Sequence, residues 1–125
     1  VLHLSYGNFS GLFTGDVEGE GEQEAENYLQ EFWQSGQKKK QTRLTLLKVA
    51  HHGSRHSTSE EFLRKFQPGL AFISSGKKNW YGHPHKELLE RLEEAECRIF
   101  QTSLYGAVTI RTDGREYWLE IFRKR

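Results

Sequence analysis

Two adjacent histidines are the residues of this sequence with the clearest chemical potential. His51 and His52 directly follow an apolar segment that ends at Ala50, and Gly53 and Ser54 come next. Neutral imidazole is the side chain that most often binds metals in proteins, and the Ser54 hydroxyl can bind a phosphate oxygen of a substrate. The pattern therefore indicates a metal site. The alternative is a loop whose histidines are satisfied by backbone carbonyls.

Aspartate is scarce, since the chain has Asp16, Asp113 and fifteen glutamates. Asp113 precedes Gly114, a pair typical of a type I′ hairpin turn. Asp16 follows Gly15 at the end of a short apolar segment. A carboxylate there can bridge two divalent cations, as hydrolytic two-metal sites require. An aspartate in a simple turn after glycine is the alternative.

A third polar segment runs from Asn79 to Pro84 and combines an amide, two aromatic rings and His83. One interpretation is a substrate-binding loop, in which Trp80 and Tyr81 stack on the substrate and His83 transfers a proton or contacts a phosphate. The other is a cap at the start of the following helix, beside hydrophobic packing.

The hydropathy pattern predicts strands and helices in alternation. Strands are expected over 1–6, 11–15, 43–50, 70–74, 98–102, 107–112 and 116–122, and helices over 20–33, from Ser57 or Thr58 to 66, and from Pro84 to 95. This order predicts an α/β (α+β) fold with a mixed β-sheet flanked by helices. If the second, third and fourth strands run parallel, their carboxyl ends bring the three polar segments together.

Length and composition narrow the classes of protein. The 125 residues predict a single domain over 1–125. A formal charge of +1 argues against a dedicated nucleic-acid-coating module. The lone Cys97 excludes an internal disulfide, and we expect Lys38, Lys39 and Lys40 to lie in a surface loop. The abrupt start without Met predicts a piece excised from a longer protein.

Taken together, the motifs resemble a known family. They are Leu12-Phe13-Thr14-Gly15-Asp16-Val17-Glu18, Leu47-Lys48-Val49-Ala50-His51-His52-Gly53-Ser54, Ser74-Ser75-Gly76, Asn79-Trp80-Tyr81-Gly82-His83-Pro84, and Thr102 with Gly106-Ala107-Val108. In this order they closely resemble the C-terminal half of the metallo-β-lactamase-like domain of ComEC-type competence proteins, the DNA-internalisation channel proteins of bacterial transformation. The resemblance covers nearly the whole chain.

The resemblance implies a partial αββα sandwich and a hydrolase with two divalent metal ions, zinc or manganese. Asp16 would bridge the two metals. Either His51 or His52 would complete the second metal site, and the other would face the substrate. Asn79 and His83 match a family motif at the rim of the pocket, where we expect Asn79 to bind substrate and His83 to be catalytic.

The chain also departs from the family pattern. The main metal motif of the superfamily, of the form His-x-His-x-Asp-His, is absent, because the only histidine before His51 is His3. Near Thr102 the family often has Asp, where this chain has Ser103. We therefore expect an incomplete metal site and a chain that is inactive by itself.

The resemblance implies a nuclease or phosphodiesterase that degrades the non-transported DNA strand. It also implies a soluble domain of a bacterial cell-membrane protein, with DNA, the N-terminal half of the domain and the membrane channel as partners. A non-catalytic DNA-binding or scaffolding module of the channel is the alternative, and a hydrolase of a small-molecule lactone or phosphodiester is a third hypothesis. Without the other half of the sandwich, an apolar sheet face would be exposed. Either copies of the chain would then associate through it, or the chain would close on itself in a rearranged way.

Overall fold

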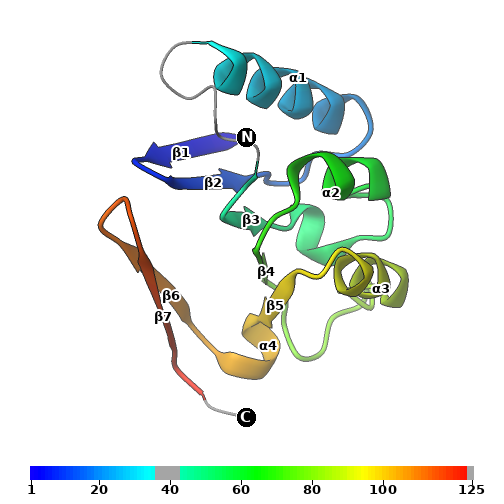
Figure 1. Ribbon diagram of the computed structural model, residues 1–125. Coiled ribbons are helices and arrows are strands. Elements are labelled where there is room, and N and C mark those ends of the chain that lie inside the picture. Colours follow the sequence, from blue (N-terminus) through cyan, green and yellow to red (C-terminus); the bar gives the residue numbers. More distant parts are fainter. Residues whose placement is uncertain (36–42, 124–125) are drawn as a thin grey trace.

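The computed structural model describes residues 1–35 and 43–123 (Figure 1). Its strands are β1 (Leu2–Tyr6), β2 (Phe9–Phe13), β3 (Leu46–Lys48), β4 (Leu70–Ile73), β5 (Arg98–Gln101), β6 (Val108–Thr112) and β7 (Tyr117–Ile121). Its helices are α1 (Glu20–Gln34), α2 (Glu60–Phe66), α3 (Lys86–Glu94) and α4 (Thr102–Tyr105), with a 3-10 turn at Ala50–Gly53. Lys38, Lys39 and Lys40 lie outside the described residues. Within the described ranges, no helix is long and apolar enough to cross a membrane.

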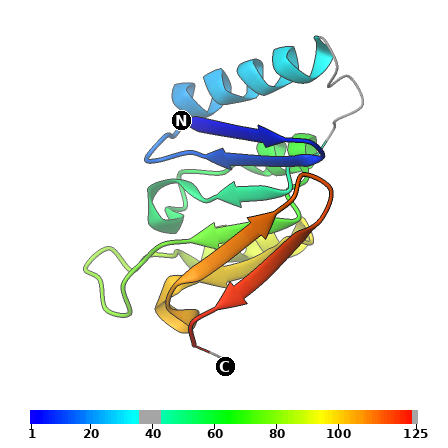
Figure 2. The ribbon, with the colours of Figure 1, turned by 90° about the vertical axis from the view of Figure 1, so that its left-hand side faces the viewer.

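Five strands form one sheet in the order β1-β2-β3-β4-β5 (Figure 2). β1 is antiparallel to β2, whereas β2, β3, β4 and β5 are mutually parallel. The predicted mixed sheet with flanking helices is therefore confirmed, including the parallel alignment of the second, third and fourth strands. Because parallel strands end at the same edge of a sheet, the segments that follow β2, β3 and β4 emerge side by side.

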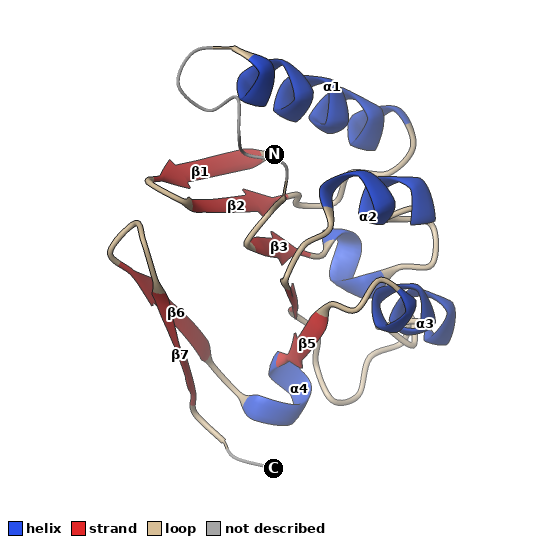
Figure 3. Ribbon diagram, viewed as in Figure 1, coloured by secondary structure: helices blue, strands red, loops and turns tan. Residues whose placement is uncertain are grey.

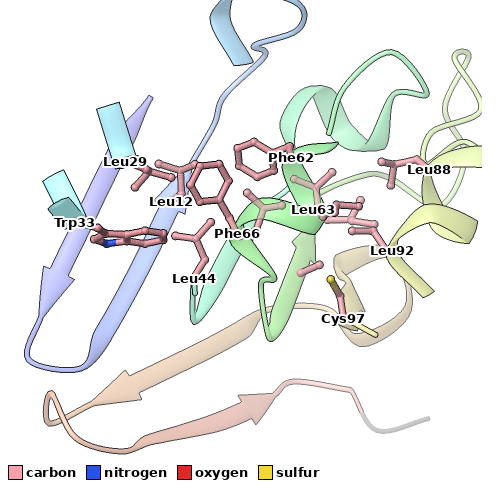
Figure 4. Close-up of a cluster of buried hydrophobic side chains, with 14 residues drawn as sticks. Leu12, Leu29, Trp33, Leu44, Phe62, Leu63, Phe66, Leu88, Leu92 and Cys97 are labelled. Atoms are coloured by element: carbon pink, nitrogen blue, oxygen red, sulfur yellow. The ribbon is translucent and has the colours of Figure 1, made fainter. Parts of the chain in front are cut away.

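Helices α1, α2 and α3 cover one face of this sheet (Figure 3). Helix α1 buries Ala25, Leu29 and Trp33 at four-residue intervals, which is the spacing that lines one side of a helix. Leu29 and Trp33 join apolar residues of the sheet, α2 and α3 in one cluster (Figure 4). Leu12 on β2 is fully buried in it, and burying one such leucine stabilises the fold by about 1.5–3 kcal/mol. This packing fixes the strand ends relative to one another.

The opposite face of the sheet is partly covered by the β6–β7 hairpin. Ile110 and Leu119 of the hairpin pack against Phe9, Leu46 and Leu70 of the sheet. The β1–β2 part of this face keeps exposed apolar side chains, namely Leu2, Leu4 and Phe13. Association of copies through this face stays a prediction.

Several predicted boundaries are wrong by a few residues. Strand β2 begins at Phe9, two residues before the predicted start, and β3 keeps only the centre of the predicted 43–50 segment. Helix α2 is capped by Ser59, whose hydroxyl accepts a hydrogen bond from the Phe62 N–H at 3.1 Å. Ser57 does not cap it because its hydroxyl donates to the backbone instead, and Thr58 has a φ of 54°.

Pro84 and Asp113 also have other roles than predicted. Helix α3 starts after His85, whose extended backbone donates its N–H to the Gly53 carbonyl, so Pro84 precedes the helix. The hairpin does connect β6 and β7 at Asp113 and Gly114, but only Gly114 has a positive φ there. The turn is therefore not type I′. The Asp113 carboxylate instead accepts hydrogen bonds from two backbone N–H groups that follow it in the chain.

Candidate functional site

The three polar segments meet at the carboxyl edge of the parallel sheet. Asp16 follows β2 and the His51–His52 pair follows β3. The His51 N–H donates to the Gly15 carbonyl at 2.8 Å and so joins these two segments. The segment after β4 is joined to the second by the His85 N–H, which donates to the Gly53 carbonyl at 2.9 Å. The predicted convergence of the three loops is therefore confirmed.

The histidine pair adopts an uncommon backbone conformation. His51 and His52 have φ values of 51° and 54°, in the left-handed region, which costs about 1–2 kcal/mol for each L-residue. Ser57 offsets part of this cost, because its buried hydroxyl hydrogen-bonds the carbonyls of Ala50 and Ser54, at 3.1 and 3.0 Å. Such strain at a strand end is typical of functional sites.

Both histidines of the pair are oriented by a hydrogen bond at Nδ1. His51 donates to the Glu18 carboxylate at 2.7 Å, and His52 donates to the Ser74 carbonyl at 2.7 Å. A carboxylate or carbonyl only accepts, so Nδ1 carries the hydrogen in each ring. In the neutral ring the lone pair is then on Nε2. This is the arrangement found for metal-binding and proton-accepting histidines.

His83 brings a third imidazole to the same place from the loop after β4. Its ring centroid lies 5.4 Å from that of His51, 6.3 Å from that of His52 and 4.6 Å from that of His85. Burial, followed by repulsion from the neighbouring histidines, lowers the pKa of His83. A neutral His83 imidazole at physiological pH can accept a proton, as the predicted catalytic role requires.

His85 is a member of this cluster that the sequence pattern does not single out. Its Nδ1 accepts the Arg55 N–H at 2.8 Å, and its Nε2 donates to the Tyr81 carbonyl at 3.0 Å. Both ring nitrogens therefore hold neighbouring loops in place. The His85 ring therefore links the segment that follows the His51–His52 turn to the loop that carries His83.

The two predicted substrate-binding residues make hydrogen bonds within the protein. The Asn79 side chain donates to the His83 carbonyl and accepts from the His83 N–H, each at 2.8 Å. Ser54 is buried, and its hydroxyl accepts the His56 N–H at 3.2 Å. Both residues shape the site in this way, and their contact with a substrate stays a prediction.

Asp16 lies exposed in a turn closed by the Val17 N–H and the Thr14 carbonyl at 3.2 Å. Burial lowers the pKa of Lys48, and the nearby Asp16 carboxylate opposes part of this shift. The Lys48 ammonium donates to the Val49 carbonyl at 3.1 Å. A half-buried cation therefore accompanies the acidic residue at this edge of the sheet.

The relatives found by comparison with known proteins include three whose similarity covers most of this chain. The chain is 39% identical over 115 residues to ComE operon protein 3 of Bacillus subtilis, with 92% of the chain and 14% of that protein covered. It is 34% identical over 110 residues to Recombination protein 2 of Haemophilus influenzae, with 88% of the chain and 12% of that protein covered. It is 31% identical over 108 residues to Competence protein ComA of Neisseria gonorrhoeae, with 86% of the chain and 14% of that protein covered.

These similarities relate the chain to the competence-protein family. The chain spans about one seventh of the length of the relatives, since it covers 12–14% of each. No protein-family model matches the chain, and no solved structure matches it significantly.

The part of this competence-protein homologue that the structure describes does not complete a metal site. Within residues 1–35 and 43–123, no group of three or more His, Cys, Asp or Glu side chains is arranged to hold a metal ion. Asp16, His51 and His52 therefore fit at most a fraction of a ligand set.

Sequence patterns miss Glu18 and Lys48 as members of the site. Glu18 is half-buried, and the hydrogen bond from His51 lowers the pKa of its carboxyl group. Both residues lie inside the motifs already identified, Glu18 two positions after Asp16 and Lys48 three before His51. Their position within those motifs is the signal that could have indicated them.

Proposed function

We propose that this chain is the C-terminal part of a metallo-β-lactamase-like domain that degrades DNA during its uptake by a bacterial competence protein in the cell membrane. The supporting observation is the meeting of His51, His52 and His83 at the carboxyl edge of the parallel sheet, beside the loop that carries Asp16. The similarity to competence proteins supports a role in DNA uptake.

The proposed reaction is hydrolysis of a phosphodiester bond. His83 is the group that accepts a proton from the attacking water, because burial and the neighbouring histidines favour its neutral form. The Glu18 carboxylate fixes the orientation of the His51 ring, and the Ser74 carbonyl fixes that of the His52 ring. Each ring therefore keeps its Nε2 atom available to bind a ligand. Asn79 is proposed to bind the substrate at the rim, and the buried Ser54 is proposed to bind a phosphate oxygen when its hydroxyl leaves the His56 N–H.

The proposed cofactors are two divalent ions, zinc or manganese. Asp16 with His51 or His52 supplies part of the ligand set. The described residues do not form a group of three or more metal-binding side chains, and the proposal places the remaining ligands in the preceding half of the domain. The chain alone is then inactive, and its proposed partners are the preceding half of the domain, the membrane channel and DNA.

The test is hydrolysis of a labelled oligonucleotide by the intact domain, with Mn²⁺ or Zn²⁺ added. Asp16→Asn should lower the rate by at least about 100-fold, since even the partners of metal ligands contribute about 10- to 100-fold. Asp113→Asn is the matched control, because an asparagine oxygen can still accept the hydrogen bonds of that turn. Full activity in Asp16→Asn would refute the proposal.

The same experiment distinguishes the second function, a non-catalytic DNA-binding or scaffolding module. The observation that favours it is that Ser54 and Asn79, the predicted substrate-binding residues, make their hydrogen bonds within the protein. In that case DNA binds to the domain in a salt-dependent manner without added metal, and no hydrolysis is detected.

A further inference from the structure

The loop between β4 and α3 exposes aromatic rings next to positive charges. Trp80 is fully exposed and Tyr81 is 76% exposed, which is unusual because large aromatic side chains are generally buried. Lys77 and Lys78 precede them, also exposed. From Ser74 to Lys86 the sequence contains no acidic residue, so the cations of the loop have no acidic neighbour within it.

The backbone of this loop is held by hydrogen bonds at both ends. The Asn79 side chain bonds to the Gly76 carbonyl at 3.2 Å and to the backbone of His83 at 2.8 Å. The Tyr81 carbonyl accepts from His85 at 3.0 Å. These bonds order the loop backbone that carries the exposed side chains. The loop therefore loses less conformational entropy when a ligand binds.

The loop also leads directly to the candidate active site. It borders an open hollow of about 640 Å³, which is lined by Lys77, Lys78, Asn79, Trp80, Gly82 and His83. The Tyr81 ring is stacked on the His83 ring, with centroids 5.6 Å apart and an interplanar angle of 22°. A ligand held by the loop therefore lies beside the histidine cluster.

We propose that the loop from Lys77 to Gly82 binds single-stranded nucleic acid next to the histidine cluster. Trp80 and Tyr81 stack on unpaired bases, and Lys77 and Lys78 contact the phosphates. This chemistry matches a single strand because its bases offer free faces to aromatic rings, whereas the bases of a duplex are already stacked on one another. The inference rests on the proposed function, for which it names the form of the substrate.

Anisotropy of a labelled oligothymidine about 12 nucleotides long measures this binding. The titration uses the 125-residue chain and EDTA, so that the result is independent of metal. Trp80→Ala should weaken binding by about 5- to 150-fold, the range expected for one stacked base. Trp118→Ala is the matched control, because Trp118 is 51% exposed on the β6–β7 hairpin, away from the loop, and its binding should stay within about twofold.

The lysines are tested through the salt dependence of binding. Changing both Lys77 and Lys78 to Gln should reduce the slope of log K against log salt by about 1.4, since each phosphate contact with a single strand contributes about 0.7. Lys86→Gln is the control, because Lys86 lies on α3 and pairs with Glu90. It should leave the slope unchanged.

Three results would overturn the inference: no oligonucleotide binding, equal affinity of wild type and Trp80→Ala, or equal affinity for a duplex of the same length. Binding of vesicles that contain anionic phosphatidylglycerol, in place of the oligonucleotide, would assign the loop to a membrane surface instead. The proposed hydrolysis fails separately. Full activity of Asp16→Asn refutes hydrolysis at this site and leaves the strand-binding result unchanged.

Discussion

Gly53 is a residue at which the histidine turn lies directly against the loop after β4. Its φ is 89°, and its carbonyl accepts the His85 N–H. A Cβ added at this position would lie 2.5 Å from the Cβ and 2.9 Å from the Cα of Pro84. The same added Cβ would lie 3.5 Å from the Cγ2 of Ile73. Gly53→Ala therefore forces the two loops of the site apart.

The expected destabilisation has two parts. An alanine with positive φ costs about 1–2 kcal/mol. Inserting a methyl group into this packed contact costs a further amount of about 1–3 kcal/mol. The Pro84 Cα and Cβ belong to a closed ring, so they cannot rotate away from the added methyl group. The sum is about 2–5 kcal/mol, a large fraction of the roughly 5–15 kcal/mol that stabilises a typical domain. For a chain of this size, the melting temperature should fall by about 8–20 °C.

Thermal unfolding followed by circular dichroism measures this difference. Gly82→Ala is the matched control, because Gly82 has a φ of 66° but a Cβ there meets nothing within 4 Å. The control should lose only the conformational part, about 1–2 kcal/mol. If Gly53→Ala unfolds at the same temperature as Gly82→Ala, the close contact with Pro84 does not hold the site together, and the reasoning is refuted.

Three further predictions concern single side chains. Burial raises the pKa of the Cys97 thiol to about 11, so alkylation at pH 8 should be slow in the folded chain and fast in urea, and equal rates would contradict it. The Ser59 hydroxyl caps α2 by accepting the Phe62 N–H. Ser59→Ala should therefore lower the free energy of unfolding, measured by urea titration, by about 1 kcal/mol; an unchanged value would contradict this prediction. The hydrogen bond from His51 lowers the pKa of Glu18 below its usual 4.5, so this carboxylate stabilises the folded chain above pH 4.5, and the contribution is lost as the pH falls through the lower folded value. The stability difference between wild type and Glu18→Gln should therefore shrink below pH 4.5, and a constant difference down to pH 3 would contradict it.

The sequence alone determines the order of the elements and the places where polar residues leave the strands. Apolar periodicity is a local property, so it predicts helix α1 almost to the residue and places Asp16, His51 and His83 after strands. It fails at helix starts such as Ser59 and at Pro84, because the choice of cap depends on which backbone groups distant residues already occupy. The predicted metal ligands and substrate contacts remain predictions.

Only the tertiary structure decides how these residues meet. The parallel register of β2, β3 and β4 brings the loops together, and that register comes from packing the apolar faces of three helices against one sheet. The bond between Glu18 and His51 joins residues 33 positions apart, and that between Arg55 and His85 joins residues 30 apart. Contacts over such separations leave no trace in a local pattern, because burial of the shared core, and not the identity of sequence neighbours, sets the distance between the two side chains.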